Sequence, residues 1–175
     1  MDGPAVALYR QIVAQARQPS FYRDHGVPDT LDGRFDMIVL HAFLAMRRLK
    51  RIEGPEAQKV SQDLFDLLFA DMDSNLREIG VGDLGVGKRV KKMAQAFYGR
   101  VEAYEAGLTD ADPAVLQQAL ARNLYGTLQV QGRSPGEVSP AALAAMADYL
   151  RQAEAVLAAQ ADAPILAGSL QFPQL

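Results

Sequence analysis

Hydrophobic and polar positions alternate with helical spacing over most of this chain. Apolar residues recur every three or four positions in six stretches, as they do on the buried face of an amphipathic helix. The expected helices cover about residues 4–17, 31–51, 55–79, 84–108, 113–125 and 140–161. No convincing strand pattern is present, and the best candidate, residues 126–130, is short and has no obvious partner strand. The pattern predicts an all-α fold, a compact bundle of about six helices.

Proline and glycine mark the limits of these helices. Pro55, Pro113 and Pro140 each precede a periodic stretch, and proline is favoured at the first position of a helix. Residues 19–30 contain turn formers and are expected to connect the first two helices. We expect one domain over residues 1–175, with C-terminal helices in 109–163 and an irregular tail in 164–175.

Composition excludes several classes of protein. The chain has 175 residues, no cysteine and a net charge of −3. Without cysteine there is no disulfide framework, thiolate metal site or cysteine nucleophile, and the small net charge gives no argument for DNA binding. No unbroken apolar run approaches the length of about 18 residues that a membrane span needs. The first residues do not have the pattern of a secretory signal or a transit peptide, so we expect a cytoplasmic protein.

A glycine-rich segment raises the possibility of nucleotide binding. Residues 82–88 fit the first seven positions of a Walker A motif, but Arg89 stands where that motif needs Ser or Thr for Mg²⁺. The motif also needs a preceding strand, whereas residues 55–79 have a helical stripe. The pattern favours a helix–helix turn, and a nucleotide-binding helical switch that uses Gly82–Lys88 is kept as an alternative.

No set of residues suggests catalysis or a metal site. His25 and His41 are the only histidines, and neither forms the Glu-x-x-His pair that a helical di-metal site requires. His41 lies beside an apolar stripe and is expected to be a packing residue. We therefore expect no enzyme activity, no cofactor and no metal.

Charged residues concentrate where the third helix, the glycine turn and the fourth helix meet. A protein without a catalytic centre acts through its surface, and exposed polar residues near a loop often have a functional role. The candidate partner-binding residues are Asp71, Asp73, Arg77, Glu78, Asp83, Lys88 and Lys92. A second basic cluster, formed by Arg47, Arg48, Lys50 and Arg51, leaves open a peripheral membrane-surface adaptor.

Several short motifs occur together within residues 21–108. They are Phe21–Tyr22 with Gly26–Thr30, Asp32–Phe35, Leu67–Asp73, Leu76–Leu84, and Phe97–Arg100 with Ala103–Tyr104. In this combination the segment resembles the ubiquinol–cytochrome c chaperone family, which comprises assembly factors of the respiratory cytochrome bc complex.

The resemblance implies a helical chaperone that binds newly made cytochrome b and helps it to enter the ubiquinol–cytochrome c reductase complex. Mitochondrial members act with a small partner protein and near the ribosome exit, and both contacts stay open for this chain. We expect a bacterial member that works in the cytoplasm or at the inner face of the membrane. The family has no catalytic residues to transfer.

Overall fold

The computed structural model describes residues 3–78, 80, 82–126 and 138–175, with the backbone alone for residues 76, 78, 83 and 84. In these ranges the chain forms helices and no strand. The six expected helices are α1 (Pro4–Ala16), α3 (Leu31–Leu49), α4 (Pro55–Glu78), α5 (Asp83–Thr109), α6 (Pro113–Asn123) and α7 (Pro140–Ala158). Two five-residue helices, α2 (Pro19–Arg23) and α8 (Asp162–Leu166), accompany them. The predicted all-α bundle is confirmed.

Differences from the expected boundaries lie in the connections. The segment after α1 was expected to be a plain connector, but Pro19 begins the short helix α2 because proline is well suited to a first helical position. The last long helix ends at Ala158, and residues 164–166, assigned to the irregular tail, belong to α8. Residues 127–130 of the strand candidate lie outside the described ranges.

The helix starts show why these sequences fold locally as they do. Thr30 caps α3 by accepting a hydrogen bond from the Gly33 amide, and Ser139 caps α7 by accepting one from the Ala142 amide. Such caps satisfy amides that have no partner within the helix. Position 33 has no room for a side chain, because a Cβ there would lie 1.9 Å from the Pro28 carbonyl oxygen. The loop before α3 is thereby packed closely onto the first turn of the helix.

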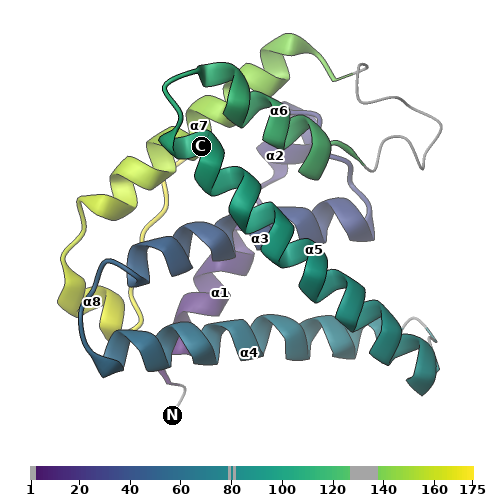
Figure 1. Cartoon of the computed structure of the whole chain (residues 1–175), viewed down its shortest axis with the longest axis vertical. Helices are drawn as coiled ribbons and strands as arrows, with labels where there is room; N and C mark the ends of the chain where they lie inside the picture. Colours follow the sequence, from purple (N-terminus) through teal and green to yellow (C-terminus); the bar gives the residue numbers. More distant parts are fainter. Residues whose placement is uncertain (1–2, 79, 81, 127–137) are drawn as a thin grey trace.

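Helix α3 lies at the centre of the molecule (Figure 1) and contacts α1, α4 and α7. Residues 39–45 are all buried, and seven consecutive buried residues mean that neighbours surround the helix on every side. Helix α5 packs against both α4 and α6, and α6 packs against α7. Helices α1, α3 and α4 thus form one packed group, to which α5–α7 are added.

A buried ion pair joins α3 to α5. The Arg100 guanidinium lies 2.9 Å from an Asp36 oxygen, and Asp36 is almost fully buried. Burial raises the pKa of Asp36 to about 7 although Arg100 opposes that rise. Beside this pair, the Tyr104 hydroxyl is buried without a hydrogen-bond partner among the described residues.

His41 is a packing residue, as its position on the apolar stripe predicted. Its ring is fully buried, with Nδ1 2.8 Å from the Met37 carbonyl oxygen and Nε2 2.7 Å from the Tyr149 hydroxyl. That hydroxyl also accepts a hydrogen bond from Gln15. Burial lowers the pKa of His41 to about 4, so the ring is neutral and links α3, α7 and α1.

The segment after α8 returns to α1. The Gln11 side chain donates to the Gly168 carbonyl and accepts from the Leu170 amide, and Gln15 donates to the Pro173 carbonyl. Gly168 has φ +101°, and a Cβ at that position would lie 3.0 Å from the Cβ of Ala7. This close return fixes residues 168–173 along α1.

Candidate partner-binding site

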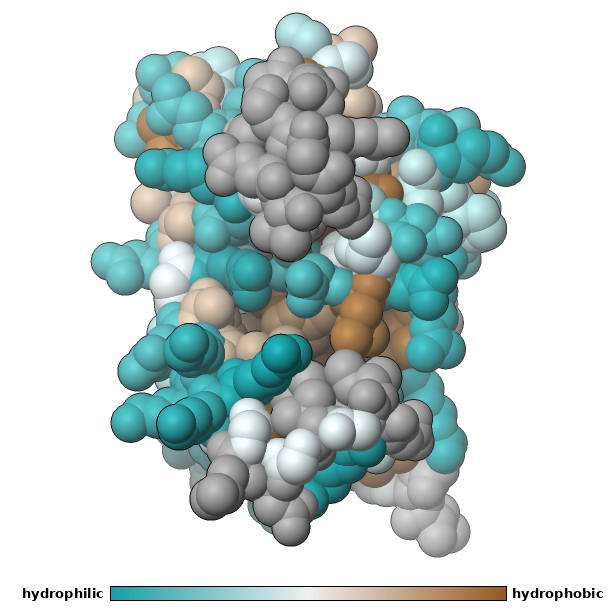
Figure 2. Space-filling view, turned by 90° about the vertical axis from the view of Figure 1, so that its right-hand side faces the viewer, coloured by the Kyte–Doolittle hydropathy of each residue, from teal (hydrophilic) through white to brown (hydrophobic). Residues whose placement is uncertain are grey.

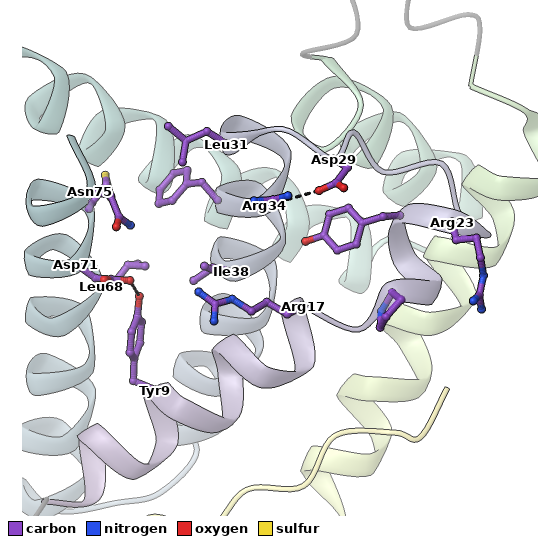
Figure 3. Close-up of a pocket in the computed structure, with 14 residues that line it drawn as sticks. Tyr9, Arg17, Arg23, Asp29, Leu31, Arg34, Ile38, Leu68, Asp71 and Asn75 are labelled. Atoms are coloured by element: carbon purple, nitrogen blue, oxygen red, sulfur yellow. Dashed lines mark hydrogen bonds and ion pairs between the residues drawn. The ribbon is translucent and has the colours of Figure 1, made fainter. Parts of the chain in front are cut away.

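A pocket of about 860 Å³ opens between α1, α2, α3 and α4 (Figure 3). Its apolar lining comes mainly from α3 and α4 and consists of Leu31, Phe35, Ile38, Leu68 and Met72. Its polar lining comes from every side and includes arginines, aspartates and tyrosines. Pockets of this size hold several side chains of a bound partner or a small ligand.

A hydrogen bond closes one side of the pocket between α1 and α4. The Tyr9 hydroxyl donates to the Asp71 carboxylate at 2.5 Å. Burial, together with the nearby Asp71 charge, raises the pKa of Tyr9, so the hydroxyl stays protonated and acts as the donor. Asp71 therefore faces the pocket with its carboxylate already partnered.

Cationic side chains line the opposite side. Arg34 pairs with Asp29 at 2.8 Å, and Arg23 pairs with Asp24 at 3.0 Å. The Arg17 side chain extends over the pocket between Tyr9 and Arg34 in Figure 3. Burial raises the pKa of Tyr9 and of Tyr22, and the positive charge of Arg17 slightly opposes both rises.

Apolar surface is exposed beside these charges. Leu31 at the pocket rim is 51% exposed, although a leucine gains about 1.5–3 kcal/mol from full burial. Figure 2 shows apolar surface in a hollow on the face that forms the right-hand side of Figure 1, with hydrophilic residues around it. Exposed apolar surface rimmed by polar residues is typical of a partner-binding site.

The seven residues predicted for partner binding do not converge on one point. Asp71 lines the pocket. Asp73 lies about 200° further round α4, at 100° per residue, and pairs there with Arg77 at 2.9 Å. Lys88 and Lys92 are exposed on α5. The side chains of Glu78 and Asp83 lie outside the described part of the structure, so the seven-residue surface stays a prediction.

An aromatic cluster between α4 and α5 was missed by the sequence reasoning. Phe65 and Phe69 contact one another, with ring centroids 4.5 Å apart, and both contact Phe97. Tyr98 joins this cluster while remaining 60% exposed. The spacing of Phe65 and Phe69 by four residues was the available signal, since residues at i and i+4 share one face of a helix.

The glycine-rich segment is part of a helix. Gly82 is the N-cap of α5, and Gly85 and Gly87 lie inside that helix. Helix α4 precedes it, where a phosphate-binding loop would follow a strand. Two successive helices are present as predicted, since α4 ends at Glu78 and α5 begins at Asp83, but most of the glycine-rich segment is helix and not turn. In the described residues, the structural context for nucleotide binding is missing.

The second basic cluster is largely engaged in internal contacts. Arg47 pairs with Glu105 at 2.7 Å and with Glu154 at 2.6 Å, and Arg51 also reaches Glu154. Arg48 is buried and donates to the carbonyls at the end of α7. Of the four basic residues, Lys50 is exposed and has no side-chain hydrogen bond or ion pair within the described residues. Because the three arginines are engaged in contacts within the protein, this cluster is a weak candidate for binding a membrane surface.

Among the described residues, none of the helices is both long and apolar enough to cross a bilayer. No group of three or more potential metal-binding side chains gathers in the same ranges.

The pocket itself was not predicted, because its walls come from distant parts of the sequence. Tyr9 and Asp71 are 62 positions apart, and only the folded arrangement brings them together. Arg17 follows the last residue of α1. A charged residue at a helix end is common, so the sequence alone did not indicate that Arg17 lines a pocket.

Comparison with known proteins identifies relatives of the whole fold. Residues 23–172 match the family model described as ubiquinol-cytochrome C chaperone. This range extends through the C-terminal helices, beyond the segment in which the motifs were found. The crystal structure of the Cbp3 homolog from Brucella abortus is 39% identical, with a TM-score of 0.83, and the match covers 97% of this chain and 88% of that chain.

Relatives from animals are named as assembly factors of the ubiquinol-cytochrome c reductase complex. The ubiquinol-cytochrome-c reductase complex assembly factor 1 of Xenopus laevis is 24% identical over 120 residues, which cover 69% of this chain and 59% of that protein. The corresponding Mus musculus protein is 24% identical over 121 residues, 69% of this chain and 40% of its own length. The matched part thus spans about half the length of these relatives. The extent of the family match shows that this chain belongs to the ubiquinol–cytochrome c chaperone family.

Proposed function

We propose that this chain is an assembly chaperone that binds newly made cytochrome b and promotes its entry into the ubiquinol–cytochrome c reductase complex. Membership of the chaperone family is the observation that carries this proposal. The relatives named as assembly factors of that complex support it. The chain acts by binding and not by catalysis.

The surface of the protein supports a binding role. Its side facing the α4–α5 turn combines an open pocket, exposed apolar groups and charged residues, and interfaces commonly pair an apolar centre with a polar rim. We propose that Asp71, Asp73, Arg77, Glu78, Asp83, Lys88 and Lys92 contribute to the client-binding face. Because Asp71 and Asp73 lie on different faces of α4, the client would extend around the end of that helix.

The site of action follows from the client. A newly made membrane protein is met in the cytoplasm at the inner face of the membrane, and the chaperone would act there. A small partner protein or the ribosome would be a further contact, as the family resemblance implies for mitochondrial members.

Affinity purification from the native host tests the proposal. A tagged chain should enrich cytochrome b above an untagged control, and deletion of its gene should lower the amount of assembled reductase. A small partner protein or ribosomal proteins in the eluate would extend the proposal. Normal reductase in the deletion strain, with no cytochrome b in the eluate, would rule the function out.

A charge-reversal variant tests the proposed face. Asp73→Lys, Lys88→Glu and Lys92→Glu together should reduce recovered cytochrome b without unfolding the protein. The control reverses one exposed positive and one exposed negative charge elsewhere, Arg122→Glu and Asp148→Lys. Equal recovery from both variants would remove these residues from the client-binding face.

A further inference from the structure

Arg17 differs from the other arginines of the pocket. Arg34 and Arg23 each pair with an aspartate, and Asp71 accepts a hydrogen bond from Tyr9. Within the described residues, the structure gives the Arg17 side chain no hydrogen bond and no ion pair, and the backbone amide bonds only within the last turn of α1. The pocket therefore contains one cation whose charge is not matched by an internal carboxylate.

The lining next to Arg17 is apolar and accessible. Ile38 of α3 and Leu68 of α4 lie close to the Arg17 side chain in the view of Figure 3, and Leu31 stands at the far rim. Ile38 is only partly buried. An occupant would thus meet apolar side chains and an unmatched positive charge in the same place.

The shape of the pocket favours a segment of a protein chain as its ligand. The lining residues form a strip from Asn75 on α4, across α3 and Arg17, to Arg23 on α2 (Figure 3). Four helices contribute to that strip, and it opens to the protein surface. An apolar groove between helices, rimmed by polar groups, is a common receptor for an amphipathic segment with apolar side chains on one face.

We propose that this pocket binds an amphipathic segment of the client in which apolar side chains adjoin an acidic residue, and that the client carboxylate pairs with Arg17. This inference rests on the proposed function and specifies the client chemistry for one part of the surface. Arginine binds a carboxylate through two parallel N–H groups. Covering the pocket with apolar side chains would exclude water and strengthen that pair.

Arg17 is a specificity determinant under this proposal and not a structural residue. It is exposed, and exposed substitutions outside special contacts change the free energy of unfolding by no more than about 0.5 kcal/mol. Arg17→Glu should therefore leave the protein folded while repelling an acidic segment. Charge complementarity of this kind selects among partners.

Peptide binding tests the proposal directly. Overlapping 15-residue peptides that cover cytochrome b are screened against the purified chain, and each bound peptide is resynthesised with its acidic residue changed to Gln or to Lys. We expect the bound peptides to contain an acid next to apolar residues. Arg17→Glu should lower the affinity for the unmodified peptides at least tenfold and should restore binding of the Lys-substituted peptides. The control Arg122→Glu should leave the affinity for both kinds of peptide unchanged.

The results separate this inference from the proposed function. If cytochrome b co-purifies with the chain but the peptides bind equally to parent and Arg17→Glu, the pocket proposal is overturned and the chaperone function stands. The same conclusion follows if no peptide binds although cytochrome b co-purifies. If cytochrome b does not co-purify and reductase assembly is normal without the gene, the proposed function itself fails.

Discussion

The two sides of α3 use polar side chains in opposite ways. Toward α7 and the C-terminal segment, polar groups bond to one another: His41 meets Tyr149, Gln15 reaches Pro173, and Arg48 is buried against the end of α7. Toward α4 and α2, they line an open pocket, and Arg17 faces it without an internal carboxylate partner in the described residues. The comparison indicates that the first side maintains the fold and the second is available to a partner.

The largest loss of stability is expected at the centre of the first side. Phe21 is fully buried, with its ring centroid 4.9 Å from that of Tyr149 and 5.6 Å from that of His41. Phe21→Ala should lower the free energy of unfolding by about 3–5 kcal/mol, because it leaves a cavity. Urea unfolding measures this, with the exposed Leu31→Ala as control. An equal decrease in the free energy of unfolding for both variants would contradict the assignment of the fold-maintaining role to the α7 side of α3.

Low pH should lower the free energy of unfolding, because His41 becomes protonated on the side of α3 that faces α7. Burial lowers the pKa of this residue to about 4, below its ordinary value of about 6.5. The stability contributed by the neutral ring is present above pH 6.5 and is lost as the pH falls toward 4, by about 3 kcal/mol. Urea unfolding of the parent and of His41→Gln across this range isolates the effect, since other groups titrate in both. Parallel curves would show that His41 does not titrate as expected.

Removing Arg48 should loosen the attachment of α8. Its guanidinium donates to the Leu157 and Gln160 carbonyls and pairs with Asp162 at 2.6 Å. Arg48→Met should lower the free energy of unfolding by about 1.5–3 kcal/mol, as expected for hydrogen bonds to a charged group. It should also speed proteolysis near α8. Lys50→Met is the matched exposed control, and an equally stable Arg48→Met protein would exclude a structural role.

A smaller effect is expected on the pocket side. Tyr9→Phe removes one hydrogen bond to Asp71 and keeps the ring. The free energy of unfolding should fall by about 1 kcal/mol, which thermal or urea unfolding can measure. A loss as large as that of Phe21→Ala would mean that the pocket wall is part of the structural core.

The smallest effect is expected at the surface pair of α4. Asp73 and Arg77 are partly exposed and spaced by four residues, and such pairs contribute about 0.3–0.5 kcal/mol. Asp73→Ala should therefore leave the unfolding curve almost unchanged while reducing recovery of cytochrome b. A loss above about 1 kcal/mol would assign Asp73 to the fold instead.

Local patterns predicted the helices, because each long helix has its own periodic stripe and most start at a recognisable residue such as Pro55 or Pro113. They also predicted that His41 packs inside. The same patterns missed α2, because residues 19–30 were interpreted as a connector although Pro19 begins a short helix. They missed the pocket as well, because a contact such as Tyr9–Asp71 depends on how α1 crosses α4, and no short segment determines that crossing.

The return of residues 168–173 to α1 links the fold to the order of synthesis. The glutamines of α1 are made early, yet the backbone groups that they bind are made more than 150 positions later. During translation α1 can pack against α3 and α4 before that segment exists. The side chains of Gln11 and Gln15 gain these backbone partners only when residues 168–173 have left the ribosome.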